Sequence, residues 1–307
     1  MGTSRFAEVI LNSLIDNEYN IISVYTKPDK KVGREQKIQK PEIKLLAEKN
    51  NLAVFQPEKL DGETIEEIKK QNPDLIIVAA YGKILPEAVL DIPQFGAINV
   101  HPSLLPKFRG PSPIQNALLE GEKETGTTIM LMDKDMDTGD ILKQKKIDIN
   151  LNETYKEFIE KISAESTELL LETIPVWIEK KITPGKQNDS EATYCQLIER
   201  SDGKIIWSDS AESIYNRWRA LSPWPGVFSF WERNGSNLRL KLEKISYRPG
   251  DLLKDSFGEI MRFGDKIAVA AGSGMIILEE VQLEGKAIIK IEDFINGYPE
   301  FIGGVLK

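Results

Sequence analysis

The chain contains very little cysteine and histidine. Its 307 residues include one cysteine, Cys195, and one histidine, His101. A single cysteine cannot form an internal disulfide, which is typical of a reducing compartment, and we therefore expect a cytoplasmic protein. A single histidine excludes metal sites that need two or more imidazole ligands, and we predict no metal cofactor. His101 is also the only candidate for an imidazole that transfers protons near neutral pH.

Long apolar runs are missing as well. The longest run, residues 75–81, is far shorter than the roughly 18 residues that a membrane-spanning helix needs. Residues 1–20 lack the basic start and apolar stretch of a secretory signal. We therefore expect no association with a membrane.

Positive charge is scarce in total but concentrated in two segments. The 40 lysines and arginines are outnumbered by 48 acidic residues, which gives a net charge of −8. Residues 27–44 nevertheless contain seven cations and three acids, and residues 204–248 contain eight cations and four acids. Phosphate contacts act within about 8 to 10 Å at physiological salt, so an acidic protein with such segments can still bind a nucleic acid locally.

The hydrophobic pattern changes along the chain and predicts two domains. In the first half, short β-branched runs alternate with amphipathic helical patterns, which is typical of an α/β domain with a parallel sheet. Beyond a polar stretch with proline and glycine, short strands separated by turn residues indicate a small β-barrel or sandwich. We place the domains at residues 1–182 and 201–307, and a linker at residues 183–200.

Polar side chains end a buried strand that we predict over residues 97–101. Asn99 and His101 are two residues apart, so both point to one face, at the carboxyl end of the strand where open α/β sheets bind ligands. An acidic turn at residues 135–140 follows the next predicted strand and can bring a carboxylate beside the imidazole. The pattern contains no serine or cysteine nucleophile, which favours direct, proton-assisted group transfer over a covalent acyl-enzyme.

Three motifs begin at this strand. They are Asn-Val-His-x-Ser-Leu-Leu-Pro-x-x-x-Gly at residues 99–110, Glu-Thr-Gly-x-Thr at 124–128 and Asp-Thr-Gly-Asp at 137–140. Together they resemble the 10-formyltetrahydrofolate-dependent formyltransferase family. Further stretches are similar to the members that act on methionyl initiator tRNA, and they lie at residues 25–29, 55–57, 80–86, 113–115 and 223–225, together with Trp207. The resemblance covers nearly the whole chain, and implies a Rossmann-like formyltransferase domain followed by an OB-like β-barrel domain.

The resemblance also implies a reaction and its residues. The α-amino group of methionine on initiator tRNA would attack the formyl carbon of 10-formyltetrahydrofolate. Asn99 and His101 would stabilise the resulting oxyanion, and Asp137 would orient His101. The residues implied for folate binding are Ser103, Leu104, Leu105, Pro106, Tyr81, Gly82, Ile84 and Leu85. Those implied for tRNA binding are Lys30, Lys31, Arg34 and Lys37, on a loop that enters the acceptor stem. The C-terminal domain would also bind tRNA, and we expect a monomer.

Other functions remain open at this point. A formyltransferase that acts on a sugar nucleotide or another small amine shares the Asn, His and Asp residues. A hydrolase that releases formate would use water as the acceptor. A protein without turnover could still bind folate or tRNA.

The beginning of the chain departs from the family pattern. The family has a strand that leads into Gly-Thr-Pro-x-Phe-Ala, whereas this sequence starts with Met-Gly-Thr-Ser-Arg-Phe-Ala at residues 1–7. We therefore expect either a longer natural product or a gap between the strands predicted at residues 20–25 and 74–81. Backbone groups left unpaired beside such a gap would each cost about 1 to 3 kcal/mol.

Overall fold

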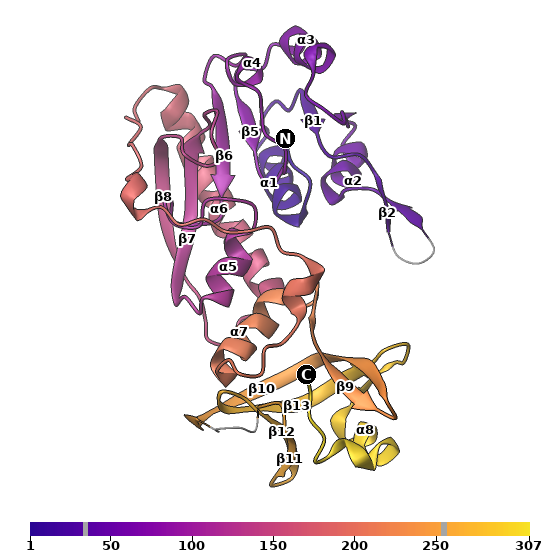
Figure 1. Ribbon diagram of the computed structural model, residues 1–307. Coiled ribbons are helices and arrows are strands. Elements are labelled where there is room, and N and C mark those ends of the chain that lie inside the picture. The colour runs from indigo at the N-terminus through magenta and orange to yellow at the C-terminus, as the bar shows by residue number, and fades with distance from the viewer. Residues whose placement is uncertain (33–35, 253–256) are drawn as a thin grey trace. The chain divides into compact units, whose positions relative to one another are not determined.

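The computed structural model describes residues 1–32, 36–252 and 257–307, which form two compact units (Figure 1). The first unit consists of Met1–Pro113, Lys123–Ile149 and Glu157–Gln196. The second consists of Ile114–Glu122, Asn150–Lys156 and Leu197–Lys307. The second unit thus includes two short segments from within the predicted first domain, and the predicted linker at residues 183–200 is divided between the units.

The first unit alternates helices and strands. Its helices are α1 (Arg5–Asp16), α2 (Glu42–Lys49), α3 (Gly62–Gln71), α4 (Glu87–Leu90), α6 (Tyr155–Ile178) and a 3-10 turn at Asp189–Glu191. Its strands are β1 (Ser23–Tyr25), β2 (Lys30–Val32), β3 (Lys37–Gln39), β4 (Ala53–Phe55), β5 (Ile76–Val78), β6 (Ala97–His101), β7 (Glu124–Leu131) and β8 (Ile141–Asp148).

The main sheet of the first unit is mixed and has the order β5-β6-β7-β8. Strands β5 and β6 are parallel, whereas β6 with β7 and β7 with β8 are antiparallel. The prediction of a parallel sheet is therefore wrong for β7 and β8. The short turn between these two strands reverses the chain, which a parallel pair cannot do without a long crossover. Strand β8 lies at the edge of the sheet, as its polar alternation predicts.

Alternation along β6 separates the core from the site. Ile98 and Val100 join a core formed largely by α1, α2 and α6. Ala97 faces the opposite side and belongs to a second core that includes residues of α3 and α4. Asn99 and His101 have the parity of Ala97, so they lie on this second face, toward the carboxyl end of the strand.

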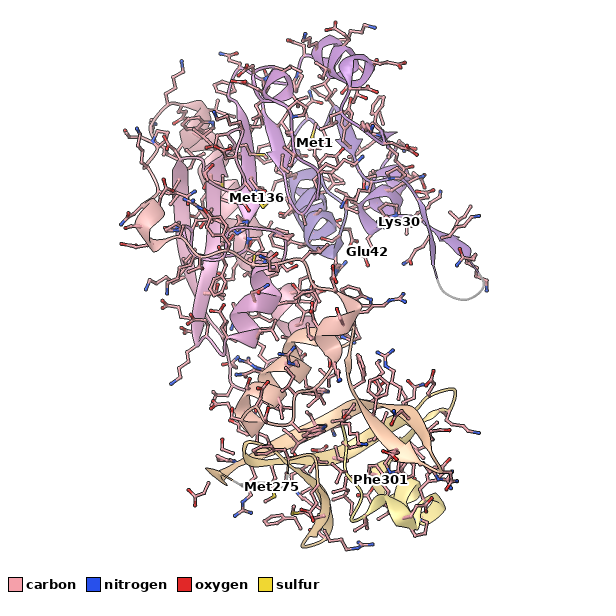
Figure 2. All side chains as sticks on the ribbon, viewed as in Figure 1. Met1, Lys30, Glu42, Met136, Met275 and Phe301 are labelled. Atoms are coloured by element: carbon pink, nitrogen blue, oxygen red, sulfur yellow. The ribbon has the colours of Figure 1, made fainter. Side chains whose placement is uncertain are left out.

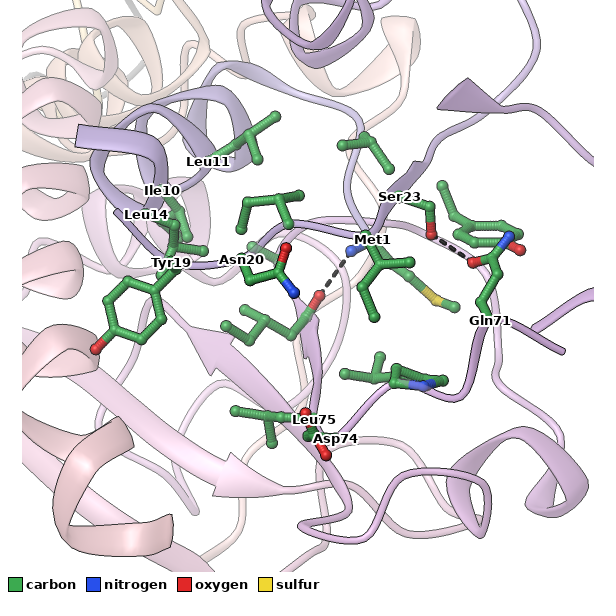
Figure 3. A pocket seen from close by; sticks show the side chains of 18 of the residues that line it. Met1, Ile10, Leu11, Leu14, Tyr19, Asn20, Ser23, Gln71, Asp74 and Leu75 are labelled. Atoms are coloured by element: carbon green, nitrogen blue, oxygen red, sulfur yellow. Dashed lines mark hydrogen bonds between the residues drawn. The ribbon is translucent and has the colours of Figure 1, made fainter. Parts of the chain in front are cut away.

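Met1 and Gly2 join two separate groups of strands. Strands β1 and β4 form their own parallel pair. Gly2 donates to the carbonyl of Tyr25 at 2.9 Å, and the amide of Ala79 donates to the carbonyl of Met1 at 3.0 Å. A cavity of about 330 Å³ lies between the beginnings of β1 and β5 (Figure 3), and its lining residues include Ile10, Leu14, Tyr19, Ser23, Gln71 and Leu75. Met1 and Gly2 thus link the pair β1–β4 to the sheet that contains β5, and the cavity lies beside this link.

The lysine-rich segment, which the sequence leaves as a loop, contains a hairpin. Strands β2 and β3 pair antiparallel, with Lys31 opposite Ile38. The hairpin projects beyond α2, and its side chains Lys30, Lys31 and Ile38 are exposed (Figures 1 and 2). Residues 33–35 connect its strands and lie outside the described residues.

The second unit is mostly β-structure. Its strands are β9 (Val227–Arg233), β10 (Ser236–Leu252), β11 (Ile260–Phe263), β12 (Lys266–Ala270), β13 (Ser273–Leu283) and β14 (Ile288–Lys290). Its helices are α5 (Pro113–Leu119), α7 (Ala211–Leu221), α8 (Ile291–Gly297) and 3-10 turns at Arg200–Gly203 and Pro299–Phe301. The sheet order is β11-β12-β13-β10-β9, with β14 paired to β13. These described pairings do not by themselves close a barrel.

A buried arginine ties the inserted segments to α7 within the second unit. Arg219 is 3% exposed and donates to Asn216 Oδ1 at 2.9 Å. It also donates to the carbonyls of Leu118, Asn150 and Glu153 at 3.4, 3.5 and 3.4 Å. These carbonyls belong to the segments that precede Leu197 in the sequence, so Arg219 explains why those segments pack with the second unit.

Candidate active site

His101 is held at the end of β6 by a backbone carbonyl. The residue is 4% exposed, and its Nε2 lies 2.9 Å from the carbonyl oxygen of Phe108. A carbonyl can only accept a hydrogen bond, so the proton of the neutral ring resides on Nε2. Nδ1 then carries the lone pair, and it lies 3.7 Å from Oδ1 of Asp137. The ring therefore presents a proton-accepting nitrogen next to a carboxylate.

Asp137 is fixed mainly by donors other than His101. Its carboxylate accepts hydrogen bonds from Asn99 Nδ2 at 3.2 Å and from the amide of Gly110 at 2.8 Å. Its backbone is left-handed, with φ of +55°, which is rare outside glycine. The structure thus brings together Asn99, His101 and Asp137, the three residues that the sequence assigns to catalysis.

The turn that carries Asp137 is tightly built. Asp133 accepts hydrogen bonds from the Thr138 hydroxyl at 2.7 Å and from the Asp135 amide at 3.1 Å. A Cβ atom on Gly139 would lie 1.9 Å from the carbonyl oxygen of Leu131. Only glycine therefore allows the turn to pack against the end of β7 in this way.

The residues expected to bind folate after β6 form a braced turn. The Ser103 side chain is buried, and its hydroxyl donates to the carbonyl of Lys107 at 2.7 Å. The Leu105 side chain is also buried, and its amide donates to Thr128 Oγ1 at 3.2 Å. Leu104 and Pro106 are only half-buried. Leu104 and Pro106 therefore offer more accessible apolar surface than Ser103 and Leu105.

The second group of expected folate residues follows β5 and is divided in the same way. Tyr81 and Leu85 are buried in the core. Gly82 is exposed, and Ile84 is 75% exposed. Burial raises the pKa of Tyr81 to about 12, so its hydroxyl stays protonated at neutral pH. That hydroxyl has no hydrogen-bond partner among the described residues.

The lysines that we predict to bind tRNA lie on the hairpin formed by β2 and β3. Lys30, Lys31 and Lys37 are exposed, and Arg34 lies outside the described residues. The nearby acid Asp29 is paired with Lys44 of α2 at 2.9 Å. Hydrogen bonds from Gln56 and then Lys44 lower the pKa of Asp29. Asp29 is therefore charged, and Lys44 of α2 pairs with it.

The part of the chain that the structure describes contains neither a cluster of metal-binding side chains nor a membrane-spanning helix. In residues 1–32, 36–252 and 257–307, no group of three or more His, Cys, Asp or Glu side chains could hold a metal ion. No helix in this part of the chain is long and apolar enough to cross a membrane.

Comparison with known proteins covers both units. Residues 1–174 match the "Formyl transferase" family and residues 197–299 match "Formyl transferase, C-terminal domain". The chain is 43% identical over 312 residues to "Methionyl-tRNA formyltransferase" of Caldicellulosiruptor saccharolyticus, covering 100% of this chain and 98% of the relative. It is 40% identical over 308 residues to the enzyme of the same name from Citrifermentans bemidjiense, covering 100% and 95%. The chain belongs to the methionyl-tRNA formyltransferase family.

Two solved structures of formyltransferases share the fold of this protein. One is an N-formyltransferase from Helicobacter canadensis, crystallised with folinic acid and dTDP-3-aminofucose. It has a TM-score of 0.64 at 21% identity and covers 90% of this chain and 96% of its own. Another is the sugar 3N-formyltransferase WlaRD, with a TM-score of 0.64 at 20% identity, covering 93% and 97%. At these identities the likeness concerns the fold.

Two polar residues near the site, Arg109 and Gln187, are not predicted by the sequence. Arg109 is 1% exposed and lies between Phe108, which binds His101, and Gly110, which binds Asp137. Gln187 lies in the segment predicted to be a linker, and its Nε2 donates to the carbonyl of Asp137 at 2.9 Å. Arg109 occupies a position that the motif of residues 99–110 leaves unspecified, so the motif does not single it out. Gln187 carries no sequence signal, because it lies 50 residues from its partner.

Proposed function

We propose that this protein transfers the formyl group of 10-formyltetrahydrofolate to the α-amino group of methionyl initiator tRNA, as a cytoplasmic monomer. The observation that carries the proposal is 40 to 43% identity, over the full chain, to methionyl-tRNA formyltransferases. The position of Asp137, beside both the Asn99 amide and Nδ1 of His101, supports the proposal. Formyl transfer needs a group that accepts the proton of the attacking amine and a hydrogen-bond donor that stabilises the negative charge on the formyl oxygen.

We assign proton transfer to His101. Its Nδ1 takes the proton that the attacking amine loses and returns it to the leaving nitrogen. The imidazolium formed in between lies beside the Asp137 carboxylate, whose negative charge stabilises it. Asp137 therefore acts on the charge state and orientation of the ring.

We assign stabilisation of the formyl oxygen to Asn99 first. One N–H of its amide is directed at Asp137, which leaves the second N–H for the negative charge that develops on that oxygen. The Nε2 proton of His101 is committed to Phe108. The ring therefore has no spare N–H for the formyl oxygen until Nδ1 has taken a proton.

The residues that follow β5 and β6 fit a folate. When bound, 10-formyltetrahydrofolate supplies a formyl carbon attached to a nitrogen that can leave. Its flat pteridine suits accessible apolar side chains, so we expect Ile84, Leu104 and Pro106 to contact it directly. Tyr81 and the buried pair Ser103 and Leu105 would shape the site from behind, and Gly82 would allow close approach.

We assign tRNA binding to the hairpin β2–β3, with Lys30, Lys31, Lys37 and Arg34, and to the second unit. An OB-like barrel for this unit is supported by residues 303–307, which bond to both edges of the sheet. The amide of Lys307 donates to the carbonyl of Phe230 and the amide of Gly303 donates to that of Ile260, at 2.9 and 2.8 Å. Such barrels commonly bind nucleic acids. In this assignment residues 1–182 form the catalytic domain, and residues 201–307 the tRNA-binding domain beyond the linker at 183–200.

The proposal is tested by initial rates of methionyl-tRNA formylation with 10-formyltetrahydrofolate. We expect His101→Ala to lower kcat by roughly 100- to 10,000-fold. We expect Asn99→Ala to lower it by roughly 100- to 1,000-fold. Asn12→Ala is the matched control, because Asn12 is exposed on α1 and its side chain donates to Asp16 of the same helix.

Three outcomes would refute the proposal. Formylation of dTDP-amino sugars in preference to the tRNA would assign a small-amine acceptor. Release of formate without an amine would assign a hydrolase. Binding of folate or tRNA without turnover would assign a non-catalytic protein.

A further inference from the structure

The backbone of Asp137 accepts a hydrogen bond from Gln187, a side chain that is distant in the sequence. Nε2 of Gln187 donates to the carbonyl of Asp137 at 2.9 Å and to the carbonyl of Gly139 at 2.8 Å. The first of these carbonyls belongs to Asp137 itself, and the second lies two residues later in the same turn. Since Asp137 has a left-handed backbone, its conformation needs support from its surroundings. Gln187 provides that support from outside the turn.

The other end of the Gln187 amide is held by Arg109. Oε1 of Gln187 accepts hydrogen bonds from Nε and Nη2 of Arg109 at 3.1 and 2.8 Å. An arginine can only donate and a carbonyl can only accept, so the partners fix which end of the amide is nitrogen. Both N–H groups and the oxygen are thus engaged. The amide has a single orientation that satisfies all its partners.

Arg109 links Gln187 to the backbone next to His101. Its backbone pairs with the segment that follows Gln187: the Arg109 amide donates to the Thr193 carbonyl at 2.9 Å, and the Cys195 amide donates to the Arg109 carbonyl at 2.8 Å. Its guanidinium also binds the exposed Asp189 at 2.7 Å. The preceding residue, Phe108, is the one whose carbonyl binds Nε2 of His101. One segment therefore braces both members of the His101 and Asp137 pair.

We infer that Gln187, oriented by Arg109, is a positioning residue that sets the location of the Asp137 carboxylate relative to Nδ1 of His101. Gln187 touches the turn that carries Asp137, so its effect on the reaction passes through that turn. The inference rests on the proposed function for its kinetic readout only. Its structural readout, the environment of the single imidazole, is independent of the reaction.

Two substitutions separate positioning from general stability. Gln187→Glu keeps an acceptor for Arg109 but turns the donor that faces two carbonyls into a second acceptor. Gln187→Met keeps the length of the side chain but removes both the acceptor that faces Arg109 and the donor that faces the two carbonyls. Gln196 offers matched controls, because it is an exposed glutamine in the same segment, and Gln196→Glu and Gln196→Met make the same chemical changes.

Steady-state formylation and thermal unfolding are measured for all four variants. We expect both Gln187 variants to lose at least roughly tenfold in kcat, with the KM of each substrate within about twofold. Gln187→Glu should unfold at a higher temperature than Gln187→Met, because its carboxylate keeps a charge-assisted contact with Arg109 that methionine cannot make. A kcat loss confined to the less stable variant would overturn the inference in favour of a purely structural role.

A double-mutant cycle with Asp137→Asn tests the route of the effect. If Gln187 acts through Asp137, adding Gln187→Glu to Asp137→Asn should lower kcat by less than about twofold more. Fully additive losses would overturn the inference. Long-range ¹H–¹⁵N spectra should also show the same His101 ring resonances shifted by Gln187→Glu and by Asp137→Asn. Unshifted resonances in Gln187→Glu would overturn the inference, whereas an inactive native protein with shifted resonances would count against the proposed function alone.

Discussion

The carbonyl oxygen of Phe108 lies 2.9 Å from Nε2 of His101, and this contact decides which ring nitrogen can take part in proton transfer. Because the carbonyl only accepts, the neutral ring keeps its proton on Nε2. The nitrogen without a proton is then Nδ1, and Oδ1 of Asp137 lies 3.7 Å from it. The backbone thus aims the basic nitrogen at the carboxylate.

Asp137→Asn is expected to lower kcat by about 100-fold, because the imidazolium loses the charge that stabilises it. The substitution keeps the size of the side chain, so KM for both substrates should change little. Steady-state formylation measures this. Asp135→Asn is the matched control in the same turn, since Asp135 is exposed and should tolerate the change. Equal kcat values for the two variants would remove Asp137 from the mechanism.

Charge reversal on the hairpin should weaken the use of tRNA selectively. For Lys30→Glu and Lys31→Glu we expect a higher KM for tRNA and an unchanged KM for folate, and we expect the same of Arg34→Ala. Each lost phosphate contact should reduce the slope of log affinity against log salt by about 0.9. Lys59→Glu reverses an exposed lysine outside the hairpin and serves as the control. Parallel losses for tRNA and folate would contradict a role in tRNA binding.

Much of this arrangement can be predicted from the sequence, and β6 is the clearest case. The sequence predicts a strand over 97–101, and the structure has it over the same residues. The strand is apolar except for two polar residues at alternate positions, and this pattern is local. Periodicity therefore suffices to place Asn99 and His101 on one face. The motif around Asp137 likewise predicts its contact with this face.

Strand direction and distant contacts could not be predicted in this way. The alternation of helical and strand patterns favours a parallel sheet, but the direction of β8 is set by its short connection to β7, which periodicity does not record. The segment that contains Gln187 is polar and includes proline and glycine, which indicates a linker. Its order comes from hydrogen bonds to Arg109 and Asp137, and no local pattern records partners so far away in the sequence.

Gly139→Ala should destabilise the protein, because the added Cβ would lie 1.9 Å from a backbone oxygen that cannot move freely. We expect a loss of roughly 1 to 3 kcal/mol in the free energy of unfolding, measured by urea denaturation. A fall in kcat should accompany it, since the turn carries Asp137. At Gly62, in the first turn of α3, a Cβ would meet nothing within 4 Å. Gly62→Ala should therefore raise stability by about 0.4 to 1 kcal/mol, and a similar loss at both sites would contradict the argument.

The buried amino group of Met1 should make stability depend on pH. It donates to the carbonyl of Ile77 at 2.6 Å (Figure 3), and burial lowers its pKa to about 5. In an unfolded chain the amino group has a pKa of about 8. Between these values the unfolded state binds a proton that the folded state does not, so the free energy of unfolding falls as the pH is lowered from 8 to 5. The full difference corresponds to at most about 4 kcal/mol.

Urea denaturation of the protein that starts at Met1, measured from pH 8 to pH 5, tests this linkage. Acetylation of the amino group removes its titration and leaves every other ionisable group in place. The difference between the two pH curves therefore isolates Met1 from the carboxylates and other groups that titrate in the same range. We expect the free-amine protein to lose stability more steeply below pH 8 than the acetylated protein does. Parallel curves would mean that the amino group stays in water rather than against Ile77.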